Sequence, residues 1–222
     1  MIYVTGSIRG RLGKYQKLLE KIDLRSQDDL YVVGDIIGDG TDSIKLLEDM
    51  SMRSNVFAVL GDNEYFAHKI MTDIADENGA MRGKLPEVMP SDIEGTVKEF
   101  LLMDDEGRSW VMEYLCEMSL YEEINAGGRE YLLIHSGIGD FDPDKSVSDY
   151  GIKELALSVT DYKKIYYPGK ILVTGHTPTY KIDKSFRGQI YRNGEHIALN
   201  CAEEGGGYLA VVCLDTGEEY YI

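Results

Sequence analysis

Apolar residues alternate between short runs and helical stripes over the first sixty positions. The runs Ile2–Thr5, Leu30–Val33 and Val56–Leu60 are each followed directly by a glycine, which is typical of buried strands. Between them, apolar residues at helical spacing predict helices over Leu12–Ile22 and over residues 42–50, with Asp42 as the cap. Strands separated by helices favour βαβ units and a parallel sheet.

The middle of the chain has apolar residues at helical spacing, and the end has the patterns of strands and turns. The segment Ser91-Asp92-Ile93-Glu94 matches a capping box and predicts a helix through Leu102. A polar turn at Asp104–Gly107 and a helix around Trp110–Met118 are predicted next. Strands are then predicted at Tyr121–Ile124, Glu130–His135, Lys170–Thr174 and, in antiparallel order with turns that include Gly205–Gly207, from Gln189 to Ile222. No linker interrupts these patterns, so residues 1–222 are predicted to form a single domain.

Polar side chains suited to chemistry follow several of these strands. Asp35 and Asp62 come after the second and third strands, and His135 and His176 stand at the ends of two later ones. Ligands of open α/β sheets bind at the carboxyl ends of the strands, so we expect the loops that carry these residues to converge. Mixed nitrogen and oxygen donors suit Mn, Fe or Zn better than Ca or Mg. These four residues are therefore the candidates for a metal site.

Five motifs occur in a fixed order along nearly the whole chain. They are Gly6-Ser7-Ile8-Arg9-Gly10, residues 34–40, Gly61-Asp62-Asn63-Glu64, Ile134-His135-Ser136-Gly137 and Gly175-His176-Thr177-Pro178. Their order and spacing resemble the calcineurin-like metallophosphoesterases, in the branch of bacterial and phage Ser/Thr protein phosphatases and diadenosine tetraphosphatases. The resemblance implies an α/β fold, a four-layer α/β/β/α sandwich of two mixed sheets flanked by helices. It also implies two metal ions at the loops.

The chain departs from this family at catalytic positions. The family writes its first motif G-D-x-H-G, whose Asp and His hold the first metal, and this chain has Ser7 and Arg9 there. The second motif, G-D-x-x-D-R-G, has Gly38 and Asp39 in place of its second aspartate and its phosphate-binding arginine. The third, G-N-H-E, has Asn63 where the family places the histidine that protonates the leaving group.

By resemblance, the ligands of the second metal are Asp35, Asp62, His135 and His176, and all four are competent. One divalent transition metal, Mn, Fe or Zn, is the expected cofactor. The first metal position is expected to be empty, because a serine is a poor ligand and a guanidinium has no lone pair to offer. The other hypothesis is a metal-free site, closed by a salt bridge of Arg9 with Asp35 or Asp62.

These losses predict a catalytically impaired pseudo-phosphatase that keeps one metal half-site and binds a phosphorylated or other small ligand, or a protein partner. None of the degenerate positions Ser7, Arg9, Asp39 and Asn63 is expected to keep its catalytic role. In two-metal hydrolases both ions stabilise the developing charge, and losing one electrostatic donor costs roughly 100–1000-fold in rate. The alternative is an active one-metal phosphoesterase that acts on a phosphoprotein, a phosphodiester or a nucleotide. Conventional phosphatase activity ranks last.

Composition narrows the partners and the cellular setting. The formal net charge of −16 would repel nucleic-acid backbones and anionic membranes, so neither is an expected partner. The three cysteines, Cys116, Cys201 and Cys213, form no C-x-x-C motif and fit buried thiols in a reducing compartment. No leader-like or membrane-spanning segment is recognisable, and we expect a cytoplasmic protein.

Overall fold

Two five-stranded sheets form the centre of the computed structural model, which describes residues 1–203 and 206–222. The first sheet has the order β12-β11-β1-β2-β3 and the second the order β4-β5-β6-β8-β7. The strands of the first sheet are β1 (Ile2–Thr5), β2 (Asp29–Val33), β3 (Val56–Val59), β11 (Ala210–Cys213) and β12 (Glu219–Tyr221). Those of the second are β4 (Tyr121–Ala126), β5 (Arg129–Ile134), β6 (Lys170–Thr174), β7 (Tyr191–Arg192) and β8 (His196–Ala198). A hairpin of β9 (Ala202–Glu203) and β10 (Gly206–Gly207) stands apart from both.

Both sheets are mixed. Strands β1, β2 and β3 run parallel, as the alternation of strands and helices predicted, and β11 and β12 extend that sheet in antiparallel order. In the second sheet β5, β6 and β8 are parallel, with β4 and β7 antiparallel at the edges. Among the described strands from Gln189 to Ile222, the pairs β7–β8, β9–β10 and β11–β12 are antiparallel, as predicted, and β8 in addition pairs in parallel with β6. The chain crosses over through two short helices before β8 and returns in the direction of β6.

Side-chain alternation along the strands separates three apolar clusters. In β1, Tyr3 belongs to the cluster under the helices, and the adjacent Val4 belongs to the cluster between the sheets. In β5, Leu133 faces the other sheet, whereas Leu132 and Ile134 face the outer cluster of the second sheet. Successive side chains of a strand point to opposite faces, so both sheets are buried on both faces. Each fully buried aliphatic side chain stabilises the fold by about 1.5–3 kcal/mol.

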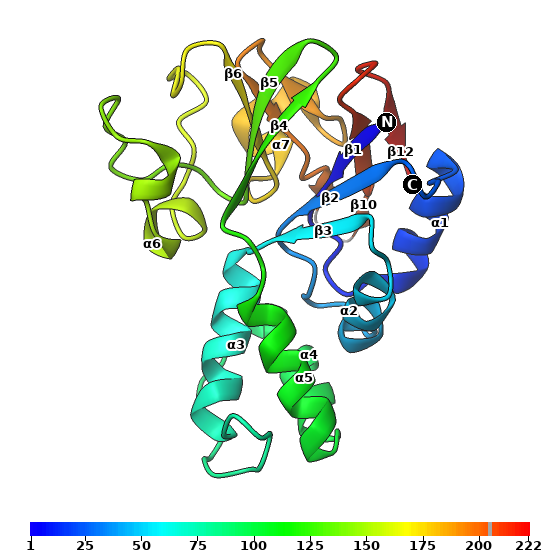
Figure 1. Cartoon of the computed structure of the whole chain (residues 1–222), viewed down its shortest axis with the longest axis vertical. Coiled ribbons are helices and arrows are strands. Elements are labelled where there is room, and N and C mark those ends of the chain that lie inside the picture. The colour runs from blue at the N-terminus through cyan, green and yellow to red at the C-terminus, as the bar shows by residue number, and fades with distance from the viewer. Residues whose placement is uncertain (204–205) are drawn as a thin grey trace.

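Helices cover the outer faces of both sheets. Helices α1 (Leu12–Ile22) and α2 (Ser43–Ser51) bury their apolar stripes on the first sheet, and the Leu12–Ile22 prediction is confirmed to the residue. The 3₁₀ helix η1 (Val147–Asp149) and α6 (Ile152–Leu155) cover the outer face of the second sheet. Helix α7 (Thr179–Ile182) and η2 (Lys184–Phe186) lie in the connection from β6 to β8. The layers are helix, sheet, sheet and helix, as predicted (Figure 1).

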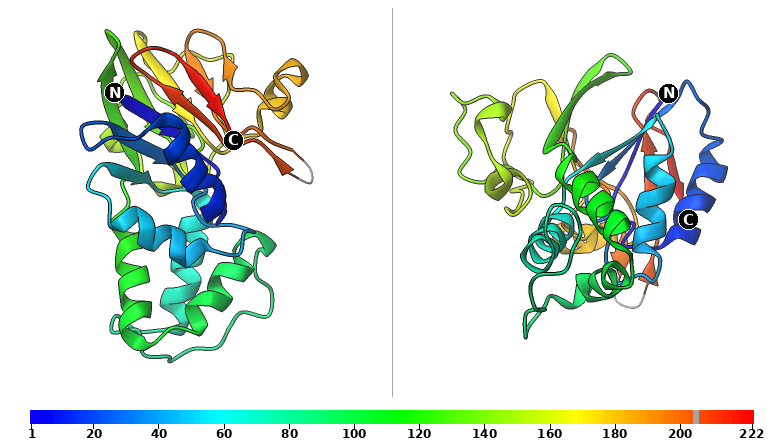
Figure 2. Two further views of the ribbon diagram at one scale, coloured as in Figure 1. Left: turned by 90° about the vertical axis from the view of Figure 1, so that its right-hand side faces the viewer. Right: turned by 60° about the horizontal axis from the view of Figure 1, so that its bottom comes forward.

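Three further helices form a lobe that projects from one end of the sheets (Figures 1 and 2). They are α3 (Asp62–Ile74), α4 (Ser91–Leu101) and α5 (Asp105–Cys116). Ile74, Val97, Phe100 and Val111 join the lobe to the cluster under α1 and α2. The sequence predictions did not include α3, although it begins at one of the candidate metal ligands.

One cap prediction and one turn prediction in this lobe were wrong. The N-cap of α4 is Pro90, and no side-chain cap bond is found, because Ser91 already lies inside the first turn. The predicted turn at Asp104–Gly107 is instead the start of α5, where the Asp104 carboxylate accepts a hydrogen bond from the Gly107 N–H (2.9 Å). An aspartate at this position caps a helix as readily as it starts a turn, so sequence alone did not separate the two readings.

Three smaller expectations have direct outcomes. Among the described residues, no helix has both the length and the apolar character needed to cross a bilayer. All three cysteines are free thiols, and Cys116 is exposed rather than buried. Of the turn predicted at Gly205–Gly207, Gly205 lies outside the described residues and the other two glycines form β10.

Candidate metal centre

The structure brings the four candidate ligands together. Asp35 follows β2, His135 follows β5, His176 follows β6, and Asp62 is the first residue of α3. One ligand atom from each of the four side chains lies within 4.8 Å of the others. Asp35 follows a strand of the first sheet and His176 a strand of the second, so the packing of the two sheets against each other brings residues 141 positions apart in the chain (35 to 176) into one site.

His135 is the centre of this cluster. Its Nε2 atom lies 3.1 Å from Asp62 Oδ1, 3.2 Å from His176 Nδ1 and 3.9 Å from Asp35 Oδ1. Its other ring nitrogen, Nδ1, lies 2.9 Å from the Val33 carbonyl and donates to it. A backbone acceptor on one imidazole nitrogen fixes the tautomer of the neutral ring, whose Nε2 lone pair then points into the cluster. The ring is fully buried and held in a ligating orientation.

Charges of opposite sign stabilise one another within the cluster. Burial opposes a charged His135, but Asp35 and Asp62 outweigh it and raise the pKa of His135 to about 9. Burial also opposes a charged Asp62, but His135 lowers the pKa of Asp62 to about 2. Burial raises the pKa of Asp35 to about 6. Without metal, the carboxylates thus retain a cation on His135. Their excess negative charge and the mixed donor set fit a divalent transition metal.

Gly34 allows the loops to approach this closely. It has a φ of 74°, and a Cβ there would lie 2.1 Å from His135 Nδ1 and 2.8 Å from the Gly61 Cα. The next residue, Asp35, also has a left-handed φ of 53°, which turns its carboxylate back towards the cluster. Any side chain at position 34 would displace the imidazole.

Glu64 is a site residue that the sequence reasoning missed. Its fully buried carboxylate accepts hydrogen bonds at 2.9–3.0 Å from four backbone N–H groups, those of Gly61, Asp35, Ile36 and Ile37. It therefore holds the loop of Asp35 against the start of α3. A glutamate three residues after the glycine that ends a strand is the third helical position of a capping box, and this signal was available in the sequence.

Ser7 and Asn63, two of the residues that depart from the family motifs, make contacts with other protein groups. The Ser7 hydroxyl donates to the Gly175 carbonyl (2.7 Å) and lies 3.2 Å from Asp35 Oδ2. The Asn63 amide is buried and donates to the Ile37 carbonyl (3.2 Å). Each polar group is occupied in holding two segments together.

Arg9 does not pair with Asp35 or Asp62, so the predicted closing salt bridge is wrong. Its Nη2 lies 2.5 Å from Asp92 at the start of α4, and its Nε lies 3.3 Å from Asp39. The cause is steric and local. Arg9 has a left-handed φ of 56°. Its Cβ lies against Gly38, where an added Cβ would come within 2.6 Å of it. This backbone conformation and close contact direct the Arg9 side chain towards the helical lobe. Asp35 still acts on Arg9 through its charge.

Asp39 is neutralised rather than exposed to a ligand as a free charge. Arg11 Nη2 lies 2.9 Å from one of its oxygens and Arg9 Nε 3.3 Å from the other. The network of Arg9, Arg11, Asp39 and Asp92 has no net charge. The family pattern has an aspartate in the first motif and an arginine in the second, whereas this chain has Arg9 in the first and Asp39 in the second.

The Arg9–Asp92 pair links the site to the helical lobe, and we expect a small coupling energy. The Arg9 side chain is 23% exposed and that of Asp92 is 49% exposed, so solvent screens the pair. A double-mutant cycle of Arg9→Ala and Asp92→Ala in urea unfolding should give about 0.5–1 kcal/mol. The exposed Glu94–Lys98 pair on the same helix is the matched control and should give about 0.3–0.5 kcal/mol. A coupling energy near zero at Arg9–Asp92 would contradict the link.

Comparison with known proteins agrees with this geometry. The model of the family described as calcineurin-like phosphoesterase matches residues 2–213. A symmetrical bis(5'-nucleosyl)-tetraphosphatase of Shewanella sp. (strain W3-18-1) is 30% identical over 138 residues, and one of Acidovorax sp. (strain JS42) is 28% identical over 139. These matches cover 61% and 62% of this chain but only 44% of each relative, so less than half the length of those relatives is represented.

Solved structures share the fold. A crystal structure of a candidate diadenosine tetraphosphatase superposes with a TM-score of 0.67 at 17% identity, covering 100% of this chain and 92% of the other. A metallophosphoesterase from Sphaerobacter thermophilus gives 0.56 at 13% identity, covering 99% and 85%. With the family model spanning nearly the whole sequence, the chain belongs to the calcineurin-like phosphoesterase family.

Proposed function

We propose that this protein is a catalytically impaired phosphoesterase that holds one divalent transition metal with Asp35, Asp62, His135 and His176. One observation carries the proposal. These four donors converge within 4.8 Å, whereas Ser7 and Arg9, at the positions that hold the first metal in the family, are engaged with other protein groups.

The donor set supports a single metal such as Mn, Fe or Zn. Two carboxylates and two imidazoles are available, and the Val33 carbonyl orients His135 for ligation through Nε2. When bound, such a metal supplies Lewis-acid polarisation of a phosphoryl or other ligand oxygen. Experiments should use protein that is stripped of metal and loaded with manganese alone, because the same site would also take iron or zinc under uncontrolled conditions.

The surrounding residues support binding better than turnover. Asn63 cannot donate a proton as a general acid, and its amide is already bonded to a backbone carbonyl. Arg9 and Arg11 share Asp39, so a phosphate would have to compete with that carboxylate for both guanidinium groups. We therefore propose a phosphorylated or other small anionic ligand, or a protein partner, as the natural occupant of this site, in a cytoplasmic setting.

The second candidate is an active one-metal phosphoesterase. The four donors that would hold a catalytic metal are all present, and His135 is already oriented for ligation, which favours this candidate. The curated relatives are named as symmetrical bis(5'-nucleosyl)-tetraphosphatases, which makes dinucleoside tetraphosphates the first substrates to test.

Metal addition should stabilise the protein through these four residues. At a free Mn²⁺ concentration about 100-fold above Kd, linkage gives about 2.7 kcal/mol, or roughly 5–11 °C in Tm for a chain of this size. His135→Ala and Asp62→Ala should abolish the increment, measured by calorimetry on chelator-treated protein before and after loading. His68→Ala, a half-exposed histidine outside the cluster, is the matched control and should keep it. An equal Mn²⁺-induced increase in Tm in His135→Ala would contradict the assignment of His135 as a metal ligand.

Turnover separates the two candidates. We expect kcat/KM on an aryl phosphate, a bis-aryl phosphate and diadenosine tetraphosphate to lie at least about 100-fold below that of an active relative assayed in parallel with Mn²⁺. Activity comparable to the relative on any of the three substrates would replace the first candidate with the second.

A further inference from the structure

The free edge of the first sheet carries an incomplete backbone ladder. Strand β3 is the last strand of this sheet and pairs only with β2. The Leu30 N–H of β2 donates to the Asn55 carbonyl (2.9 Å), so the odd-numbered residues of this segment bond to β2. The backbone groups of Val56 and Ala58 consequently face away from the sheet.

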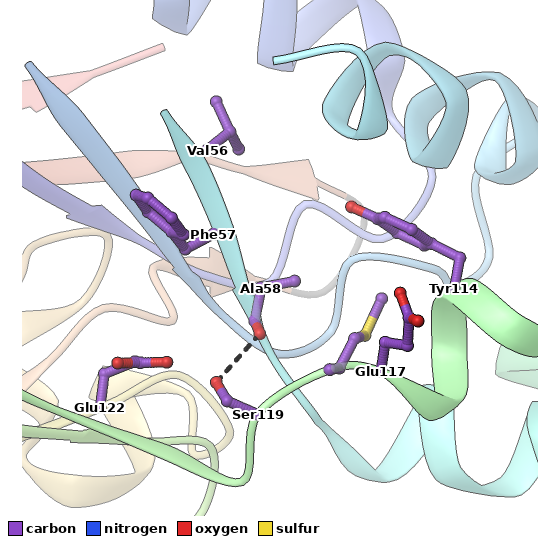
Figure 3. A pocket seen from close by; sticks show the side chains of 8 residues that line it. Val56, Phe57, Ala58, Tyr114, Glu117, Ser119 and Glu122 are labelled. Carbon is purple, nitrogen blue, oxygen red and sulfur yellow. Dashed lines mark hydrogen bonds between the residues drawn. The ribbon is translucent and has the colours of Figure 1, made fainter. Parts of the chain in front are cut away.

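Ser119 occupies only part of that edge. The Leu60 N–H donates to the Ser119 carbonyl (2.8 Å). The Ser119 hydroxyl donates to the Ala58 carbonyl (3.3 Å), as Figure 3 shows. Ser119 forms a parallel bridge to Val59, and Glu117 and Met118, just before it, connect it to the end of α5 at Cys116. Within the described part of the chain, neither the Val56 carbonyl nor the Ala58 N–H has a hydrogen-bond partner. One residue of an added parallel strand would satisfy both groups.

A pocket of about 240 Å³ opens beside this unfilled position. Tyr114 and Glu117 line it on the side of the helical lobe, and Glu122 lies on the other side of Ser119 (Figure 3). The Phe57 ring, 38% exposed, completes the wall and stacks on Tyr31 with ring centroids 4.9 Å apart. The pocket thus combines two aromatic rings with two carboxylates.

The chemistry of the walls selects a cationic occupant. Among the described residues that line the pocket, none is a lysine or an arginine, and Glu117 and Glu122 make no ion pair there. Carboxylates attract guanidinium and ammonium groups, and aromatic faces add cation–π attraction. The net charge of −16 also favours the approach of a basic partner.

We propose that this pocket binds a dibasic extended segment of a partner protein, which adds to β3 as a parallel strand. One basic residue of the segment donates its N–H to the Val56 carbonyl and accepts a hydrogen bond from the Ala58 N–H. This residue is bridged to Phe57, and bridged residues of neighbouring strands point to the same face. Its side chain therefore lies beside Phe57.

The two carboxylates explain why two successive basic residues are needed. Neighbouring side chains of a strand point to opposite faces. The side chain beside Phe57 meets Glu122 on the side of the second sheet. The side chain of the preceding residue, which lies alongside Val56, points to the other face, towards Tyr114 and Glu117 on the side of the helical lobe. The second basic residue precedes the first because Ser119 already occupies the edge beside Val59.

A blocked peptide tests the proposal on the full chain. We expect acetyl-Thr-Val-Lys-Arg-Val-Thr-amide to shift the amide resonances of Ala58 and Ser119 saturably in a ¹H–¹⁵N titration. The same peptide with norleucine and citrulline in place of lysine and arginine should bind roughly tenfold more weakly, since each partly exposed ion pair contributes modestly. Methylating the backbone nitrogen of the lysine and, in a second peptide, that of the arginine identifies the residue that donates to Val56, and one of the two should abolish the shifts.

Matched protein variants test the pocket itself. E117Q/E122Q should lower the affinity for the basic peptide roughly tenfold. E87Q/E106Q removes the same charge from two exposed glutamates elsewhere and should leave the affinity unchanged. Both doubles alter surface carboxylates, and their far-ultraviolet spectra and Tm values verify folding.

Four outcomes overturn the proposal. Equal binding of the neutral peptide, or equal loss in both double variants, removes the role of the two glutamates. Spermidine that reproduces the shifts with the same affinity, combined with no effect of either N-methylation, assigns the pocket to free amines. Absence of binding at millimolar peptide means that the glutamates only guard the edge against self-pairing.

Discussion

Glu64→Gln should lower the free energy of unfolding by at least about 3 kcal/mol and Tm by roughly 6–12 °C. One carboxylate oxygen accepts from Ile36 and Ile37, and the other accepts from Asp35 and Gly61. A carboxamide offers one acceptor oxygen, so its NH₂ group would face two buried N–H donors. Each unsatisfied buried donor costs about 1–3 kcal/mol. Urea unfolding at constant m measures the loss.

Glu99→Gln is the matched control for this substitution. The half-buried Glu99 carboxylate accepts a hydrogen bond from the Ile44 N–H at 3.2 Å, and a carboxamide keeps an oxygen for that bond. We expect Glu99→Gln to lower the free energy of unfolding by about 1 kcal/mol or less. Glu64→Gln should also reduce the Mn²⁺-induced increment in Tm, because the Asp35 backbone loses its anchor, whereas Glu99→Gln should not. Equal stability losses in the two variants would show that Glu64 does not hold the loops together.

The combined variant Ser7→Asp, Arg9→His, Asp39→Arg and Asn63→His should raise kcat/KM on an aryl phosphate at least about 100-fold above that of the natural chain. It returns the first-metal ligands, the phosphate-binding arginine and the general acid that the family resemblance implies. Position 38 is left as glycine, because a Cβ there would lie 2.8 Å from the Arg9 Cα. The measurement is steady-state hydrolysis with Mn²⁺, beside metal analysis that should find two equivalents bound.

The same variant carries an internal check on stability. Ser7 lies 3.2 Å from an Asp35 oxygen, so an aspartate at position 7 places two carboxylates together while Arg9 is removed. Without metal the variant should therefore be less stable than the natural chain, and it should gain more from Mn²⁺. Asp39→Arg with Asn63→His alone is the control and should not exceed the activity of the natural chain, since Ser7 and Arg9 still stand at the positions that the resemblance assigns to the first metal. A folded quadruple variant with two bound metals and unchanged activity would contradict our account of the impairment.

Several site features followed from local sequence pattern. Apolar runs that stop at glycine located the strand ends, and the side chains just beyond them included all four candidate ligands. Because loops at the carboxyl ends of strands bind ligands in α/β proteins, the sequence predicted that Asp35, His135 and His176 converge. Their strands belong to two different sheets, so it is the packing of the sheets against each other that brings the three together. The helix that begins at Asp62 was missed, yet the position of that carboxylate relative to β3 was sufficient.

Side-chain partners were a different matter. The sequence marked Arg9 as a cation next to carboxylates, but its direction depends on the left-handed backbone at Arg9 and on the absence of a Cβ at Gly38. Its main partner, Asp92, lies 83 residues away in the sequence, on a different helix. The spacing of apolar residues predicts that helix but not where it lies relative to the site. The Arg9 interpretation failed for that reason.

The sequence by itself therefore determined which residues match the family motifs and which depart from them, since residue types at strand ends are local facts. Only the tertiary structure decided how the altered residues are used. It ties Arg9 to the helical lobe, makes Glu64 the common acceptor for two loops, and leaves the Val56 and Ala58 backbone groups open beside two glutamates. Periodicity fixes the face and position of a residue, but its partners depend on which distant segments the fold brings within hydrogen-bond distance.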